Sequence, residues 1–119
     1  MSETNNIDSR TLLNRVAEIY HEAFLTTKKP QEYLESRGIS KPETYKAFKI
    51  GYADGRLLGT LPQSGPLVEA LKQVGILNDK GREFFYGCVV FPLLDADGNT
   101  VGMYGRKLQA GKVVHLDLP

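Results

Sequence analysis

Three short stretches of the sequence carry residue types that bind metals or phosphates. Residues 95–99 (DADGN) look like the start of a calcium loop. An EF-hand needs its glycine at position six and a closing glutamate, whereas Gly98 stands at position four and no glutamate follows. A hairpin turn that uses Asp-Gly chemistry is the better interpretation of this segment.

The second stretch is the His21–Glu22 pair, which begins like the helical zinc motif of metalloproteases. That motif needs a second histidine four residues after the first, and this position is Leu25. We therefore predict that His21 is an ordinary residue of a helix surface. Cys88 is the single cysteine, which excludes an internal disulfide and a multi-cysteine zinc site. Its neighbours are apolar, so we predict a small buried residue rather than a reactive thiol.

The third stretch is a glycine-rich run that ends in Arg106. The spacing of Gly98, Gly102 and Gly105 matches neither phosphate-binding glycine pattern. Gly102 and Gly105 lie inside a strand-like run, where glycine costs stability and packs nothing. Either a neighbouring backbone approaches closely or the strand bends there, and both would direct Arg106. A simple bulge at a sheet edge explains the glycines as well. No Ser–His–Asp order, paired carboxylates or metal cluster emerges, so the residues alone show no catalytic centre.

Composition limits the class of protein. The chain has 119 residues, of which 41% are hydrophobic, and this suits one soluble domain with its own core. A formal net charge of +1 argues neither for nor against nucleic acid, so any such argument depends on where the basic residues lie. No signal peptide or membrane-length apolar run occurs, which predicts a cytoplasmic protein without a membrane partner. Residues 1–8 are predicted to form a flexible tail, and 9–119 a single domain.

The N-terminal two thirds of the chain read as helices. An apolar stripe with a period near 3.6 residues predicts an amphipathic helix over about 9–24. A second, short helix carries Pro30 in its first turn and ends before Gly38. Ser40 and Glu43 predict a capping box for a third helix. A fourth helix opens at residue 66 and ends near 75, after the least structured interval, 59–66.

The C-terminal third reads as strands. Four runs rich in β-branched and aromatic residues are separated by turn residues, at 84–86, 88–94, 100–106 and 112–116. Helices first and strands last predict an α+β fold, with N-terminal helices packed on a small antiparallel sheet.

Three phrases in this order resemble the bacterial replicative primases, in the first subdomain of their RNA polymerase core. They are YLESRGIS at 33–40, FKIGYA at 48–53 and VVFPLLDADGNTVGMYGR at 89–106, and the likeness covers roughly 16–117. The resemblance implies a subdomain that forms one wall of a basic groove for the template strand and the RNA–DNA hybrid. Phosphate contacts of this kind position a strand without reading its sequence.

The resemblance also implies a fragment of a longer chain. Such primases carry a zinc-binding domain, this subdomain, a toprim subdomain with the catalytic acidic residues and metals, and a helicase-binding end. The chain matches the second piece, so alone it is expected to be inactive and to hold no cofactor, with Mg²⁺ expected in the toprim part. The implied partners are single-stranded template DNA, the RNA–DNA hybrid, the rest of the primase and, through missing regions, the replicative helicase.

By position in these phrases, Arg106 matches a groove arginine and Arg37 another basic residue. Tyr86 and Cys88 stand where such primases commonly have arginines that face the template, and residues 114–117 (VHLD) replace a KYLN phrase. Tyr86 and His115 are predicted to stack on bases instead. The predicted nucleic-acid-binding residues are Arg106, Arg37, Lys107, Lys112, Tyr86 and His115.

A second function stays open on the sequence alone. The chain would then be a non-catalytic protein-interaction module of a replication or mobile-element protein, which kept the fold and lost the arginines. Exposed aromatic side chains at 84–86 would support this alternative. An independent small enzyme ranks last, because no nucleophile or metal site is found.

Overall fold

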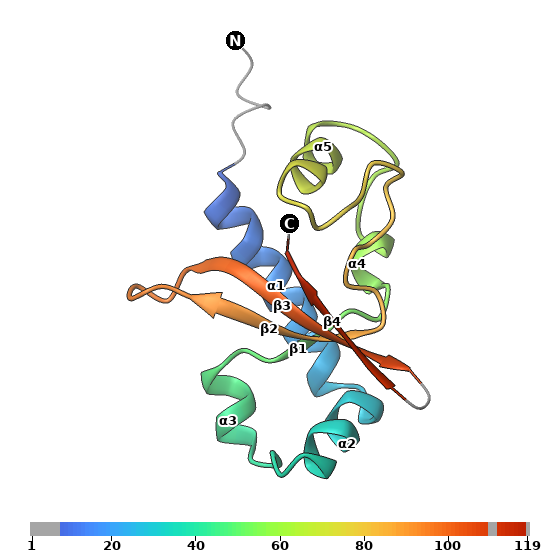
Figure 1. Cartoon of the computed structure of the whole chain (residues 1–119). Helices are drawn as coiled ribbons and strands as arrows, with labels where there is room; N and C mark the ends of the chain where they lie inside the picture. The colour runs from blue at the N-terminus through green and yellow to red at the C-terminus, as the bar shows by residue number, and fades with distance from the viewer. Residues whose placement is uncertain (1–7, 110–111, 119) are drawn as a thin grey trace.

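The computed structural model describes residues 8–109 and 112–118, except the side chains of 108–109 and 112–114. Its helices are α1 (Ser9–Leu25), α2 (Lys28–Ser36), α3 (Pro42–Ala47), α4 (Arg56–Gly59) and α5 (Pro66–Gln73), and its strands are β1 (Gly51–Tyr52), β2 (Cys88–Leu94), β3 (Thr100–Gln109) and β4 (Lys112–Asp117). The strands form an antiparallel sheet in the order β1-β2-β3-β4 (Figure 1). The predicted α+β fold is confirmed.

Helix α1 supplies five of the fifteen buried residues of the core cluster on one face of the sheet. Asp8 caps it by accepting a hydrogen bond from the Thr11 backbone N–H, so the residue predicted to end a flexible tail is part of a helix cap. The predicted apolar stripe is buried and packs with side chains of β2 and β3, among them Val90 and Met103. Residues 1–7 of the predicted tail lie outside the described part of the chain.

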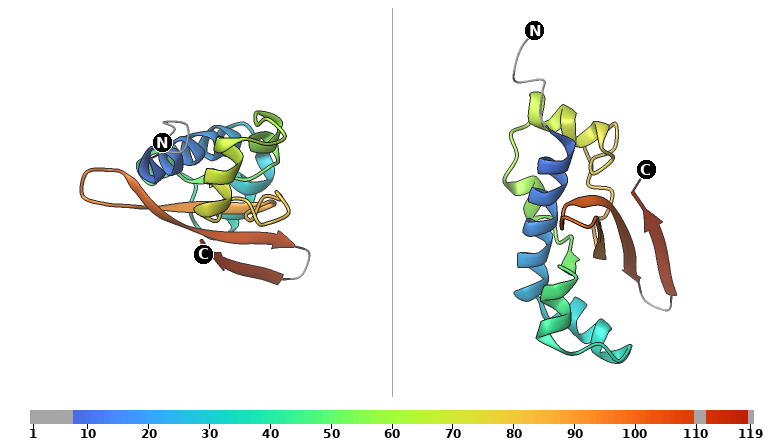
Figure 2. Two further views of the ribbon diagram at one scale, coloured as in Figure 1. Left: turned by 90° about the horizontal axis from the view of Figure 1, so that it is seen from above. Right: turned by 90° about the vertical axis from the view of Figure 1, so that its left-hand side faces the viewer.

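The opposite face of the sheet is only partly covered. A second cluster joins Phe24 of α1, Leu34 of α2 and Tyr45 of α3 to Tyr52 of β1 and Val89 of β2. Helices α2 and α3 therefore pack against the β1–β2 half of this face. Strand β3 packs against α1 on the other face, and β4 is the strand that lies farthest from α1 (Figure 2, right). This half-covered face carries the candidate site.

The capping box predicted for the third helix is wrong. The N-cap of α3 is Lys41, which makes no side-chain hydrogen bond, and Pro42 is the first helical residue. A proline at this position is preorganised for the helix, and it holds the residue before it in an extended conformation (Lys41 ψ 127°). The helix therefore begins one residue later than a Ser40 cap would require.

The strand predicted at 84–86 is also wrong, because these residues form a turn. Gly87 has a φ of 82°, its N–H donates to the Ala53 carbonyl (2.7 Å), and the Cys88 N–H donates to the Phe85 carbonyl (2.8 Å). The turn drives the Phe85 ring into the core, where it is fully buried. Three consecutive aromatic residues looked like a strand, but only the Phe85 ring is fully buried in the core.

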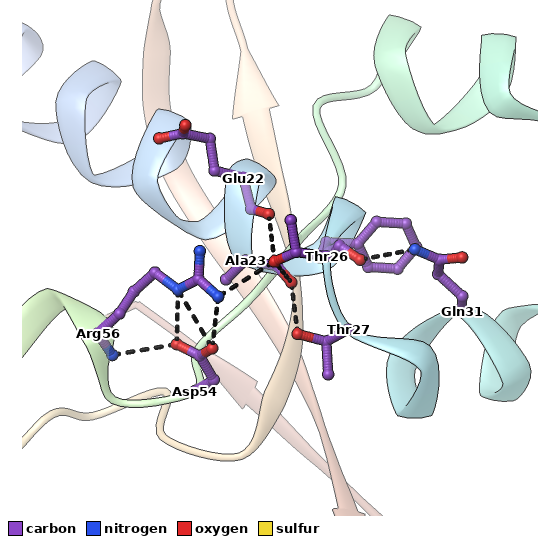
Figure 3. A network of polar contacts seen from close by, with 8 residues as sticks. Glu22, Ala23, Thr26, Thr27, Gln31, Asp54 and Arg56 are labelled. Carbon is purple, nitrogen blue, oxygen red and sulfur yellow. Dashed lines mark hydrogen bonds and ion pairs between the residues drawn. The ribbon is translucent and has the colours of Figure 1, made fainter.

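Helix α4 was not predicted from the sequence. It follows Gly55, and a network of polar contacts ties it to the end of α1 (Figure 3). The Arg56 guanidinium pairs with Asp54 (3.0 Å) and donates to Thr26 Oγ1 (3.1 Å), while the Arg56 backbone N–H donates to Asp54 Oδ1. These contacts organise a segment that lacks a sequence periodicity of its own.

The hairpin turn predicted at 95–99 is confirmed. The Asp95 N–H donates to the Asn99 carbonyl (2.9 Å), and Gly98 has the positive φ (82°) that the turn requires. Asn14 of α1 holds the turn in place, since its side chain accepts from the Thr100 N–H and donates to Asn99. Among the described helices, none is both long and apolar enough to cross a bilayer.

Candidate nucleic-acid interface

Arg106 lies on the half-covered face of the sheet and is held by two tyrosines. Its Nε donates to the hydroxyl of Tyr104 on the same strand, and its Nη1 donates to the hydroxyl of Tyr33 on α2, both at 3.4 Å. The hydrogen bond to the Tyr104 hydroxyl, followed by that to the Tyr33 hydroxyl, raises the pKa of the guanidinium, so Arg106 stays positively charged. Nη2 makes no hydrogen bond within the described residues, which leaves donors for an external acceptor.

No carboxylate neutralises Arg106 within the described residues. The ion pairs of this part of the chain are Arg15–Glu18, Arg56–Asp54 and Lys72–Glu69, all elsewhere on the molecule. Hydroxyl partners orient a guanidinium without cancelling its charge. The arrangement therefore presents a fixed positive charge on an open face, as phosphate binding requires.

Strand pairing shows which side chains share this face. Arg106 is opposite Val89 on one side and His115 on the other, and Tyr104 is opposite Phe91 and Asp117. Because alternate residues of a strand point to the same face, all of these belong to the Arg106 face. Arg37, the exposed C-cap of α2, follows Tyr33 by about one helical turn, so it borders the same face. The structure thus places Arg106 beside His115, with Arg37 about one helical turn beyond the Tyr33 that contacts Arg106.

Lys107 belongs to the other face. It is the next residue of β3 after Arg106 and pairs with Cys88, and its side chain runs beside Gly87. Tyr86, which is 57% exposed, lies in the turn next to Gly87 with its ring beside Gly55. These two predicted residues form a separate group. Lys112 begins β4, and its side chain lies outside the described part of the chain.

The glycines before Arg106 have a cause that the sequence did not reveal. A Cβ at Gly105 would come within 2.6 Å of the Phe85 ring, so an aromatic side chain, rather than a backbone, makes the close approach. A Cβ at Gly102 would lie 3.3 Å from Leu93, next to a register irregularity between Leu93 and Leu94. The predicted bend or bulge is thus at the Gly102 end, and the close approach is at Gly105.

The other residues singled out by their chemistry are explained structurally. Cys88 is fully buried, and burial raises the pKa of its thiol to about 11, as expected of an unreactive core cysteine. His21 is half-buried and not a plain surface residue, because its Nδ1 contacts the Ile50 carbonyl (2.8 Å). Within the described residues, no group of three or more histidine, cysteine, aspartate or glutamate side chains is placed to hold a metal ion.

The shape of the site suits a polymer better than a small molecule. Cavities of about 420 and 490 Å³ lie beside α1, the first toward α4 and α5 and the second toward the end of α3, and both are lined by Arg15, Ile19 and Glu22. Neither includes Arg106 or its tyrosine partners. The Arg106 face is a partly exposed sheet surface, most open at His115, that a strand of nucleic acid can cross.

Sequence reasoning missed three aromatic residues of this face, Tyr33, Tyr104 and Phe91. Tyr104 had a usable signal, because it stands two residues before Arg106 and must share its face in a strand. Phe91 follows once the register with Tyr104 is known. Tyr33 had no signal, since it meets Arg106 from a helix 73 residues away in the sequence.

Comparison with known proteins gives one consistent result. The family model for the N-terminal domain of the DNA primase catalytic core matches residues 19–115. A DNA primase of Aquifex aeolicus is 33% identical in an alignment of length 113 that covers 84% of this chain and 21% of that protein. The chain spans about a fifth of the length of such relatives.

Solved structures agree with the sequence matches. The crystal structure of the Aquifex aeolicus primase (zinc-binding and RNA polymerase domains) is similar with a TM-score of 0.79 and 29% identity, over 100% of this chain and 30% of that one. The structure of the DnaG primase catalytic domain bound to ssDNA gives a TM-score of 0.78 and 27% identity, over 93% and 38%.

Proposed function

Because this chain belongs to the family of N-terminal domains of the DNA primase catalytic core, we propose that its Arg106 face holds single-stranded template DNA. The observation that carries the proposal is the placement of Arg106, which two tyrosine hydroxyls orient and no carboxylate within the described residues neutralises. A similar primase catalytic domain has been solved with ssDNA bound, which supports this ligand.

In this proposal Arg106 binds a phosphate through its free Nη2 donors, and Arg37 binds a neighbouring phosphate from the end of α2. Contacts of this kind position the strand without reading its sequence, and they weaken as salt rises. Few positive charges share the face, so the salt dependence is expected to be shallow.

The wider role concerns the protein of which this chain is a part. We propose that it makes RNA primers in replication, that the same face also contacts the RNA–DNA hybrid, and that Mg²⁺ is held by a toprim subdomain rather than by these residues. Contact with the rest of the primase and, through other regions, with the replicative helicase belongs to the same proposal. The domain alone is expected to bind a template and not to polymerise.

The alternative of a protein-interaction module is not favoured. It predicted exposed aromatic side chains at 84–86, but Phe85 is fully buried and Phe84 packs against the core cluster. Tyr86 is the one exposed ring of the three. A single tyrosine is a small anchor for a protein partner.

Fluorescence anisotropy with a labelled oligothymidylate tests the proposal. The chain is expected to bind weakly at low salt and more weakly as salt rises. Arg106→Ala should reduce the affinity about five- to tenfold and lower the slope of log K against log[salt] by about 0.7, the value for one lost phosphate contact on a single strand. Arg82→Ala removes an exposed arginine from the turn that precedes Glu83 and is the matched control.

The proposal fails on either of two results. One is an absence of binding by the folded chain at the lowest salt. The other is an equal loss of affinity in Arg106→Ala and Arg82→Ala, which would mean that only net charge matters. Circular dichroism of each variant confirms that it is folded.

A further inference from the structure

Three rings form a row across the sheet beside Arg106. Phe91 of β2 and Tyr104 of β3 have ring centroids 6.0 Å apart, and Tyr104 and His115 of β4 have centroids 5.7 Å apart. Successive ring planes lie within 35° of one another. The Arg106 guanidinium lies 5.9 Å from the Tyr104 centroid. Strands β2, β3 and β4 therefore each contribute one ring to a single surface.

The row is most accessible at its β4 end. Phe91 packs against the cluster beneath α2 and α3, Tyr104 is half-buried, and His115 is exposed on the strand at the edge of the described sheet. Core packing therefore accounts for Phe91 but not for His115. Two half-buried rings and an exposed ring together form a platform that an external flat group can extend.

Polar contacts hold the outer two rings in place. The Tyr104 hydroxyl accepts from Arg106 Nε and contacts His115 Nδ1, so its own proton is available to the imidazole. A ring that is fixed before binding loses little conformational entropy when a base stacks on it. The same hydroxyl thus orients both the phosphate-binding guanidinium and the exposed ring.

Charge separates the two ends of the face. Arg106 and Arg37 lie toward α2, whereas Asp117, directly opposite Tyr104, is an exposed carboxylate on β4. A phosphate is attracted to the first end and repelled from the second. A strand that crosses this face is therefore oriented with its backbone toward α2 and its bases toward β4, over the ring row.

We propose that Phe91, Tyr104 and His115 form a stacking platform for unpaired bases of the strand whose phosphates Arg106 holds. This inference rests on the proposed function and adds the mode of binding. Stacking tolerates any base, because every base has a π face, and it does not depend on salt as phosphate contacts do. It supplies affinity to a face with few positive charges.

A pair of oligomers of equal length tests the platform, one of thymidylate and one of abasic sites with the same phosphates. The wild-type chain is expected to bind the thymidylate oligomer about tenfold more tightly, since stacking of one base is worth about that factor. Tyr104→Ala should remove most of this preference, and it should also weaken abasic binding to a smaller extent, because it removes one of the two hydroxyls that orient Arg106. Tyr104→Phe, which keeps the ring, should retain most of it.

Tyr86→Ala is the matched control, because Tyr86 is an exposed tyrosine grouped with Lys107 and not with Arg106. It should keep the tenfold preference. If the two oligomers bind equally and with a salt dependence, the platform is overturned and the proposed function stands. If neither binds, the proposed function fails as well. If Tyr86→Ala and not Tyr104→Ala removes the preference, bases stack elsewhere and the platform is wrong.

Discussion

Gly105 lies against the ring of Phe85, so closely that a Cβ at residue 105 would be 2.6 Å from ring atom Cδ1 and 3.2 Å from Cys88 Cβ. Because Gly105 has no side chain, the strand that carries Arg106 can pack directly against the Phe85 ring in the core. Phe85 comes from the turn before β2, so this contact couples that turn to the position of β3. The neighbouring residue, Arg106, points to the opposite face of the strand, where it pairs with Val89 and His115.

The first prediction follows from this contact. Gly105→Ala should destabilise the fold by about 1–3 kcal/mol, as overpacking of a filled core usually does. Urea unfolding followed by circular dichroism measures the change. Gly59→Ala is the control, because nothing lies within 4 Å of its added Cβ and its φ is not positive, so it should change stability by a few tenths of a kcal/mol. Equal effects of the two substitutions would contradict the contact.

The second prediction concerns Glu83, a carboxylate that is 7% exposed. Neither of its oxygens, nor the buried Tyr20 hydroxyl, has a hydrogen-bond partner of acceptable geometry within the described residues. Burial raises the pKa of Glu83 above 4.5, the Asp54 carboxylate raises it further, and the nearby Tyr20 hydroxyl opposes the shift. A raised pKa in the folded state means that the folded protein binds the proton more tightly than the unfolded chain.

The stability that Glu83 contributes is therefore fully present below about pH 4.5 and is lost as pH rises through the raised pKa. Glu83→Gln removes this titration at nearly constant size. Relative to wild type, the variant should gain about 1 kcal/mol near pH 8 and nothing near pH 4, because an unpaired buried charge is removed. Thermal unfolding at both pH values measures the difference. A gain that is the same at both pH values would show that Glu83 does not titrate in this range.

The third prediction concerns the contacts that hold α4 to α1. Burial alone would raise the pKa of Asp54, but the Arg56 backbone N–H and guanidinium outweigh it, so the pKa is lowered. This stabilisation is present above the ordinary value of 3.8 and is lost as pH falls through the lowered pKa. Asp54→Asn should cost about 0.5–1 kcal/mol at neutral pH, a modest value because the pair is partly exposed.

Chemical denaturation at neutral pH measures the cost of Asp54→Asn. Glu18→Gln is the control, since the Arg15–Glu18 pair is 3.7 Å long with side chains that are 75% and 60% exposed, and its loss should be nearly neutral. A smaller effect at position 54 than at position 18 would argue against the network of Figure 3 as a stabilising contact.

The fourth prediction separates the two faces of β3. Lys107 and Arg106 are adjacent in sequence and carry the same charge, but they point to opposite faces. Lys107→Ala should change affinity for single-stranded DNA less than about twofold, whereas Arg106→Ala should lower it about five- to tenfold. The anisotropy titration used above measures both. Similar losses in both variants would mean that the strand does not lie on the Arg106 face.

The sequence alone determined the elements whose cause is local. The stripe of α1, the Pro30 and Gly38 boundaries of α2, the turn at Gly98 and three of the four predicted strands depend on side-chain period and turn chemistry within a few residues. Local patterns failed where two signals competed. At Ser40 the predicted helix cap was overridden by Pro42, which set the start of the helix. At 84–86 a run of aromatic residues predicted a strand, but the chain turns there. The resemblance located Arg106 and Arg37, because it matches phrases residue by residue.

Only the tertiary structure decided which of these residues act together. Strand pairing placed Arg106 with His115 and Tyr104 and put Lys107 on the other face, and no local pattern contains that register. Tyr33 reached Arg106 from a distant helix, and Phe85 reached Gly105 from a turn that the sequence disguised as a strand. Such contacts join segments that are far apart in the chain, so they follow from packing of the whole core rather than from any stretch of sequence.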